Sequence, residues 1–188
     1  MDLLFIARQQ LLTATNLFFK DDDPVSVHTL AGAASELLSD LCERTGERPF
    51  HSDVLESNSS LDLVEYFAAR NIYRNSFKHI GRNKDEIDRN EDARKRFSDI
   101  QNDFLLFSCV EDYLRLAKTA PIEFQALQLW FIAVHKDRVS QTLLNSLSLG
   151  RWENLHNAER KKQKEAGYAI IQELKSNEDI LNDPKTEK

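Results

Sequence analysis

The sequence predicts an all-α protein, and two observations lead to that class. Only five glycines and four prolines occur among 188 residues, so few positions favour a turn. Apolar residues recur three and four positions apart along most of the chain, which is the period of a helix with one buried face. This length suits one domain with a proper core. We therefore predict an antiparallel bundle of about five to six helices as a single domain over residues 1–176, followed by a frayed tail over 177–188.

The first two helices have clear local boundaries. A wide apolar stripe predicts a helix over residues 3–20. Asp23 then offers an N-cap, and Pro24 suits the first turn of a helix because it has no N–H to satisfy. A second helix is expected over residues 24–44, with Gly46 closing it.

The middle of the chain predicts one helix between two irregular segments. Residues 47–60 are polar and contain a proline, so we expect a loop there. Ser59 or Ser60 is expected to cap a third helix, which carries an apolar stripe as far as its predicted C-cap at Gly81. Residues 82–96 are densely charged and lack an apolar stripe, which predicts a mobile or solvated connection that is partly helical.

The last part of the chain predicts three further helices. One is expected over residues 97–118, and Pro121 opens the next, which continues to Val134. Because only a short turn joins these two helices, we expect them to be antiparallel neighbours. Beyond the basic residues 160–164, a terminal helix is expected to dock on the bundle through its apolar positions, which are Ala166, Ala169, Ile170 and Leu174.

Composition limits the function classes. The chain has 25 basic and 31 acidic residues and a formal charge of −6, so RNA contact would have to be local. Cys42 and Cys109 lie within apolar helical patterns and are expected to be reduced core residues. No basic leader precedes the first apolar run, and no run approaches the roughly 18 apolar residues of a membrane span. We expect a soluble cytoplasmic protein without a membrane contact.

The segment around Arg74 is the main candidate for chemistry. The pattern of an arginine followed after four to six residues by a histidine occurs three times, so it is not specific by itself. The pairs are Arg44 with His51, Arg74 with His79, and Arg151 with His156. Only Arg74 is followed by a polar residue, Asn75, inside a helix with an apolar stripe.

Arg74 belongs to a regularly spaced row of basic residues. Four basic residues are spaced by four and would share one face of a continuing helix, namely Arg70, Arg74, Lys78 and Arg82. Like charges at this spacing cost ~0.2 to 0.5 kcal/mol per pair, so the stripe invites a functional interpretation with phosphate as its partner. The alternative is that acidic groups neutralise the stripe, either on a facing helix or nearby at Asp62, Glu65, Asp85 and Glu86.

The run from Arg74 to His79, on an all-α bundle of this size, resembles the signature of the HEPN superfamily. Members of that superfamily are helical bundles in which an arginine, a polar residue and a histidine form a metal-independent ribonuclease site, often across a homodimer. Other members have lost catalysis and serve as binding or scaffold modules. The resemblance implies that His79 transfers a proton at the ribose 2′-hydroxyl, that Arg74 stabilises the phosphate, and that Asn75 orients the backbone or the histidine. Substrate positioning would fall to Arg70, Lys78 and Arg82.

Helix geometry adds a requirement. At 3.6 residues per turn, side chains five positions apart point about 140° away from each other. Arg74 and His79 therefore meet only if the helix ends or distorts near Gly81, or if a second subunit supplies one of them. A homodimer is the simpler solution.

Two functions follow from these observations. The first is a metal-independent endoribonuclease without a cofactor, a toxin or defence component with a neutralising partner protein. The second is a non-catalytic bundle that binds a partner protein, a nucleotide or RNA through the basic stripe. A metal site is not expected, because Glu153 with His156 is the only pair at the spacing that a di-metal bundle needs twice. His28 is expected to be a core or hydrogen-bonded histidine, and His135 to mark a helix end.

Overall fold

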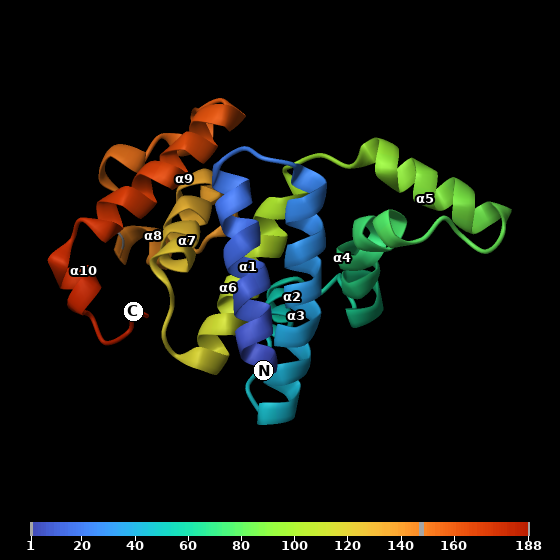
Figure 1. The fold of residues 1–188 in the computed structure, drawn as a ribbon, viewed down its shortest axis with the longest axis horizontal. Coiled ribbons are helices and arrows are strands. Elements are labelled where there is room, and N and C mark those ends of the chain that lie inside the picture. Colours follow the sequence, from blue (N-terminus) through green and yellow to red (C-terminus); the bar gives the residue numbers. More distant parts are fainter. Residues whose placement is uncertain (1, 147–148, 188) are drawn as a thin grey trace.

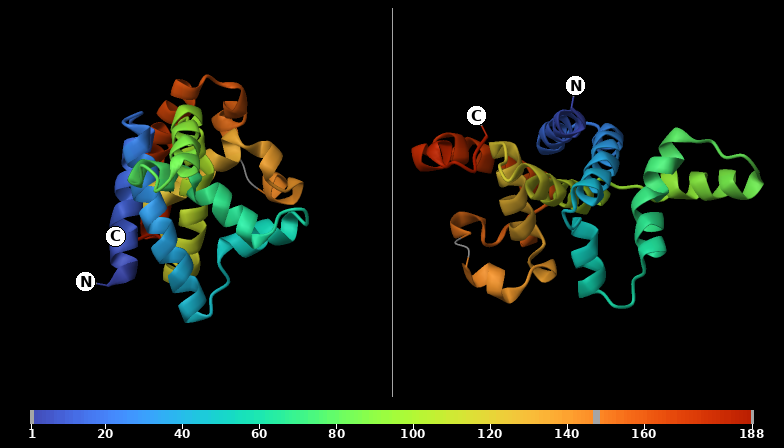
Figure 2. Two further views of the ribbon diagram at one scale, coloured as in Figure 1. Left: turned by 90° about the vertical axis from the view of Figure 1, so that its right-hand side faces the viewer. Right: turned by 90° about the horizontal axis from the view of Figure 1, so that it is seen from below.

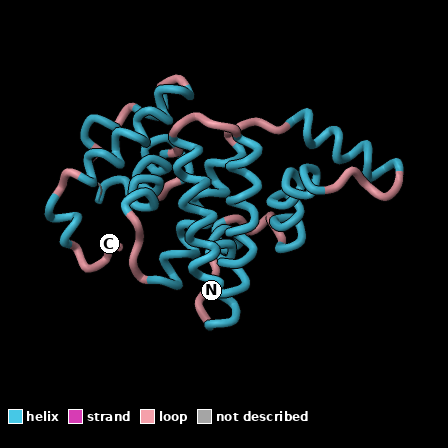
Figure 3. The backbone as a smooth tube through the Cα atoms, in the orientation of Figure 1, coloured by secondary structure: helices cyan, strands magenta, loops and turns pink. Residues whose placement is uncertain are grey.

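A computed structural model describes residues 2–146 and 149–187. Over these residues the chain consists of helices and loops and has no strand, which confirms the all-α class (Figure 3). The α-helices are α1 (Leu3–Phe19), α2 (Pro24–Thr45), α3 (Phe50–Ser57), α4 (Leu63–Lys78), α5 (Lys84–Arg96), α6 (Gln101–Ala117), α7 (Ile122–Val134), α8 (Gln141–Ser146), α9 (Arg160–Lys175) and α10 (Glu178–Asn182). Three short 3-10 turns also occur: η1 (Lys136–Arg138), η2 (Gly150–Trp152) and η3 (Leu155–Asn157). No helix in the described ranges is long and apolar enough to cross a membrane.

The α1–α2 boundary follows the local signals. The Asp23 carboxylate accepts hydrogen bonds from the backbone N–H groups of Val25 and Ser26, and Pro24 occupies the first position of α2. Gly46 ends α2 with a φ of 77°, a left-handed conformation that glycine adopts without strain. The predicted caps of this helix are therefore confirmed.

The loop predicted over residues 47–60 is wrong, because it contains α3. The N–H of Phe50, at the start of α3, donates to the Asp112 carboxylate of α6 over 2.6 Å. His51 is buried against the rings of Tyr66 and Phe67. This short helix is thus held by partners that are distant in the sequence.

The helix that carries the candidate residues is shorter than predicted at both ends. Asp62, and not Ser59 or Ser60, caps α4 through a reciprocal pair of hydrogen bonds with Glu65. At the other end α4 stops at Lys78, and the next residue, His79, is extended with φ −128° and ψ 134°.

The charged connection predicted over residues 82–96 is mostly the helix α5, which Asn83 caps through the N–H of Glu86. Figures 1 and 2 show α4 and α5 extending together to one side of the bundle. The two helices pack on each other, and α4 joins them to α2. The candidate segment around Arg74 therefore lies on this projecting pair of helices.

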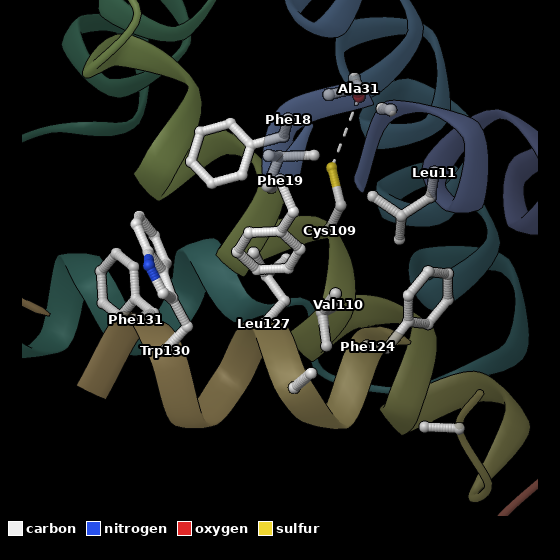
Figure 4. Packing of buried hydrophobic residues seen from close by; sticks show 14 of the residues in the cluster. Leu11, Phe18, Phe19, Ala31, Cys109, Val110, Phe124, Leu127, Trp130 and Phe131 are labelled. Carbon is white, nitrogen blue, oxygen red and sulfur yellow. Dashed lines mark hydrogen bonds between the residues drawn. The ribbon is translucent and has the colours of Figure 1, made fainter. Parts of the chain in front are cut away.

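The core lies between α1, α2, α6, α7 and α9. Figure 4 shows Trp130 of α7 beside Phe18 and Phe19 of α1, with ring centroids 5.1 and 5.7 Å from that of Trp130. Cys109 is fully buried, and its thiol donates to the Ala31 carbonyl of α2 over 3.4 Å. Cys42 is also buried and reduced, so both cysteine predictions are confirmed.

The C-terminal tail differs from the expected frayed segment, although Lys188 lies outside the described residues. It forms α10 and then runs beside the α6–α7 turn, where Ala120 exchanges backbone hydrogen bonds with Lys185 and Glu187. The Glu187 carboxylate accepts from Arg8 over 2.7 Å and from the Tyr113 hydroxyl over 2.5 Å. Contacts with α1, α6 and the α6–α7 turn therefore hold the tail in place.

Candidate functional site

Arg74 points from α4 toward α2, where it meets an acidic partner. Its guanidinium forms an ion pair with Glu36, and its side chain is only 13% exposed. The contact is ionic but lacks the alignment of a hydrogen bond. Gly32 makes room for it, because a Cβ there would lie 2.9 Å from Cδ of Arg74. An acid on a facing helix therefore neutralises this arginine, which was the alternative predicted for the stripe.

His79 lies in a different environment. The backbone N–H of His79 donates to the Asn75 carbonyl over 2.9 Å, and the His79 side chain is exposed beyond the end of α4. There it lines a surface hollow with Lys78, Ile80 and Arg94. Arg74 does not line that hollow. Although the helix ends where the geometry required, the structure does not bring Arg74 and His79 together within one chain. The side chain of Asn75 is exposed.

The predicted stripe of four cations is interrupted. Lys78 is exposed at the last position of α4. Arg82 lies beyond the helix, where its backbone N–H donates to the Glu86 carboxylate over 2.8 Å. Arg70 is half-buried and turns inward, with its guanidinium 4.6 Å from the centre of the Phe67 ring. The four residues therefore face three environments and form no continuous surface.

Arg70 lines a cavity of about 290 Å³ between α2, α3, α4 and α6. Aromatic and aliphatic side chains make up most of its walls, and a few polar groups interrupt them. The residues that line it are His28, Val54, Leu61, Tyr66, Ala69, Arg70, Tyr73, Gln101, Phe104, Leu105, Ser108 and Arg138. A mostly apolar hollow with a small number of polar groups is the usual form of a small-molecule site.

His28 of α2 is the most buried polar group of this cavity, with 3% of the residue exposed. Its Nδ1 lies 2.9 Å from Oδ1 of Asn102, whose Nδ2 donates to the Pro24 carbonyl. Because Oδ1 only accepts, Nδ1 of His28 carries the proton. Nε2 has no hydrogen-bond partner among the described residues. The prediction of a buried, hydrogen-bonded histidine is confirmed.

Burial also keeps the His28 ring neutral. Loss of solvent is the main cause that lowers the pKa of His28 below its ordinary value of 6.5, and the positive charge of Arg74 lowers it further. The hydrogen bond with Asn102 acts in the opposite direction. In neutral solution Nε2 is therefore an acceptor that faces a closed environment.

The charged side chains that line the cavity are both basic. Arg70 and Arg138 line it, and no acidic side chain is among its lining residues within the described chain. The charge of Arg70 acts on one buried carboxyl, that of Asp112. Burial raises the pKa of Asp112. The hydrogen bond from the Phe50 N–H and the positive charges of Arg115 and Arg70 act against this rise. Among the described residues no carboxylate forms an ion pair with Arg70, so its charge is only partly balanced.

Sequence reasoning identified Arg70 but not its surroundings. The cavity combines side chains from four helices, and no local spacing connects His28 with Tyr73 or Ser108. One signal was present: the small residues of α2 around Gly32 predict that another helix approaches closely there, and α4 does so through Arg74.

A second cluster of charged side chains lies outside the cavity, at the junction of α6, α7 and α9. Asp103 accepts from Nε2 of His135 over 2.8 Å and from Arg160, and His135 is the C-cap of α7, as predicted. Lys164 is 2% exposed and pairs with Asp21 and Asp99. These groups satisfy one another, which makes the cluster a structural junction. In the described part of the chain, no group of three or more potential ligands is placed to hold a metal ion.

Comparison of the chain with protein-family models, with curated proteins and with solved structures gave no match.

The burial of His28 gives a pH prediction. Its pKa is lower in the folded protein than the ordinary 6.5 of the unfolded chain, so below that pH the unfolded state binds the proton first. The contribution of the neutral His28 ring to the free energy of unfolding is complete above pH 6.5. It is lost as the pH falls toward the pKa of His28 in the folded protein. Urea unfolding across this range should show a smaller loss for His28→Gln than for the wild type. His156→Gln, at an exposed position, is the control for the substitution itself.

Proposed function

We propose that this chain is a non-catalytic helical bundle that binds a small anionic molecule in the cavity lined by Arg70. The observation that carries the proposal is the contrast between two arginines one turn apart. Arg74 is already paired with Glu36, whereas Arg70 faces a cavity without an acidic lining residue in the described chain. A guanidinium in such a site favours an anion, because charge-assisted hydrogen bonds are about twice as strong as neutral ones.

The dimensions of the cavity favour a small molecule over a macromolecule. A volume of about 290 Å³ lies just below the range for ligand pockets, roughly 300 to 1,000 Å³, and so suits a molecule smaller than a typical drug. Arg70 is half-buried and the basic stripe is interrupted, so an RNA strand would meet only the exposed Lys78 and Arg82 from it. The proposal thus narrows the predicted partner protein, nucleotide or RNA to a small anion. The HEPN-like assignment and the cytoplasmic location stay predictions.

Benzoate is a suitable first probe, since it joins one carboxylate to one planar apolar ring. Titration calorimetry should detect benzoate binding to the wild type, and Arg70→Gln should weaken it about tenfold or more, because a hydrogen bond to a charged group contributes roughly 1.5 to 3 kcal/mol. Arg82→Gln is the matched control, because it removes an exposed cation of the same stripe. Equal loss of affinity in both variants, or in neither, would contradict the cavity as the binding site.

The ribonuclease remains a second candidate, favoured by the exposure of His79 beside Lys78. It requires a homodimer that brings a second subunit's histidine to Arg74, and it requires the pair with Glu36 to open. RNA incubated with the protein in EDTA separates the two functions. Cleavage to cyclic-phosphate ends that disappears in His79→Ala would establish the enzyme and overturn the non-catalytic proposal.

A further inference from the structure

A second hollow, of about 1000 Å³, lies along α6 between α3 and α7, and the surface that lines it is mostly apolar. From α6 it is lined by Phe104, Phe107 and Glu111, which are three and four positions apart and therefore share one face of the helix. The two phenylalanines are only half-buried, although both pack on the core. This α6 groove thus leaves a stripe of the helix uncovered, and its volume is at the upper end of the range for ligand pockets.

Glu111 provides a carboxylate without a cation in the wall of the groove. The residue is half-buried, and its Oε1 accepts from Nε2 of Gln128, a residue of α7 that also lines the groove, over 2.7 Å. Oε2 accepts from no described residue, yet it is not among the side-chain oxygens that the fold closes off from solvent. No basic side chain of the described chain forms an ion pair with Glu111. One accessible oxygen is therefore left for a donor.

The other charged groups near Glu111 do not neutralise it. Arg115, one turn along α6, pairs with Asp53 over 2.5 Å, and Arg138 is exposed in η1 at another part of the groove wall. Burial raises the pKa of Glu111, and the charge of Asp53 acts in the same direction, while the hydrogen bond to Oε1 and the charge of Arg115 oppose the rise. A ligand that brings a positive charge would favour the ionised carboxylate.

The walls around this carboxylate suit an apolar body. Phe107 stacks on Phe131 of α7 with the ring centroids 4.0 Å apart, and it meets Phe50 of α3 edge to face at 5.6 Å. Leu129 of α7 and Ile180 of α10 also line the groove. Aromatic and aliphatic walls of this kind favour a ligand that removes apolar surface from water, and a planar ring fits them in offset or edge-to-face geometry.

We propose that the α6 groove binds an apolar amine, a small organic cation whose ammonium donates to Oε2 of Glu111 and whose apolar portion packs against Phe104 and Phe107. The site has the opposite charge preference to the Arg70 cavity, so the inference goes beyond the proposed function and does not depend on it. Although Phe104 lines both hollows, Glu111 lines only the groove and Arg70 lines only the cavity.

Two naphthalene derivatives of nearly equal size test the charge preference. 1-Naphthylmethylamine is a cation in neutral solution, whereas 1-naphthylmethanol keeps the ring and a donor but carries no charge. In titration calorimetry of the wild type the amine should bind about five- to tenfold more tightly, because a charge-assisted hydrogen bond is about twice as strong as a neutral one. Glu111→Gln should make the two affinities equal. Glu165→Gln, which removes an exposed carboxylate of α9, is the matched control and should preserve the preference.

A measurement on the wild type locates the cation without any variant. The ¹³C resonance of the Glu111 carboxyl group reports its titration, and the pKa of Glu111 should fall when the amine is bound and stay unchanged with the alcohol. Arg70→Gln should leave the affinity for the amine unchanged, which separates this site from the proposed anion site. The inference is overturned if the amine does not bind, if it binds no more tightly than the alcohol, or if its preference survives Glu111→Gln. None of these results would affect benzoate binding in the Arg70 cavity.

Discussion

Replacing Arg160 by alanine is expected to lower the free energy of unfolding by about 3 kcal/mol, the cost of removing one partner of a buried ion pair. Arg160 donates to Asp103 over 2.9 Å and to Asp99 over 2.8 Å, and the Asp103 side chain is only 2% exposed. The variant leaves the Asp103 carboxylate in a closed site. The remaining bond from His135 limits the loss. The guanidinium also lies 5.2 Å from the Phe18 ring centre, so packing is lost as well.

Urea unfolding at neutral pH measures this effect, and the chain provides a matched control. Arg151 pairs with Glu173 on the surface, with side chains 63% and 44% exposed. An exposed pair contributes roughly 0 to 1 kcal/mol, so Arg151→Ala should be nearly neutral. If the two variants unfold at the same urea concentration, the charged junction of α6, α7 and α9 does not hold the fold.

Gly167→Ala is expected to cost about 1 to 3 kcal/mol, although the same change at an open helix position would stabilise the protein. An added Cβ at Gly167 would lie 2.0 Å from Cε1 of Phe19, whose ring is buried between α1 and α9. The ring has little freedom to move, since it packs edge-on against Trp130. Overpacking in α9 therefore has to displace a core residue of α1.

Thermal and urea unfolding should show this loss, and two further variants identify its cause. Gly32→Ala meets only the flexible side chain of Arg74, with Cδ at 2.9 Å and Cγ at 3.3 Å, so its cost should be much smaller. Phe19→Leu in the Gly167→Ala background should recover part of the stability if the ring is the obstacle. A stable Gly167→Ala protein would show that α1 and α9 are not packed as closely as described.

The sequence predicted both boundaries of α2, which depend on neighbouring residues, but it missed the equally local cap that Asp62 and Glu65 form at the start of α4. Asp23 and Gly46 cap α2 through their own conformation or nearest backbone groups, so the local pattern was sufficient. The local pattern did not predict α3, because the carboxylate that binds the first N–H of that helix belongs to Asp112, 62 positions along the chain. The end of α4 at Lys78 was similarly misplaced toward Gly81.

For the candidate site, too, the sequence predicted the local arrangement and not the contacts between helices. The spacing by four placed Arg70 and Arg74 on one face of α4, but the partners of that face come from other helices. Glu36 of α2 neutralises Arg74, while Arg70 lines a cavity that His28 also lines. Neither outcome has a local signature, because each depends on how α4 sits against α2 and α6. A basic stripe in a sequence therefore predicts a surface only where facing helices leave it exposed.

The most direct test of the central claim is a titration of ¹⁵N-labelled protein with benzoate, followed by amide chemical shifts. The proposed function predicts that the changes concentrate on the residues around the cavity, among them His28, Arg70, Tyr73 and Phe104, and that Arg70→Gln suppresses them. Shifts confined to the hollow at His79 and Arg94, or no shifts at millimolar benzoate, would contradict it.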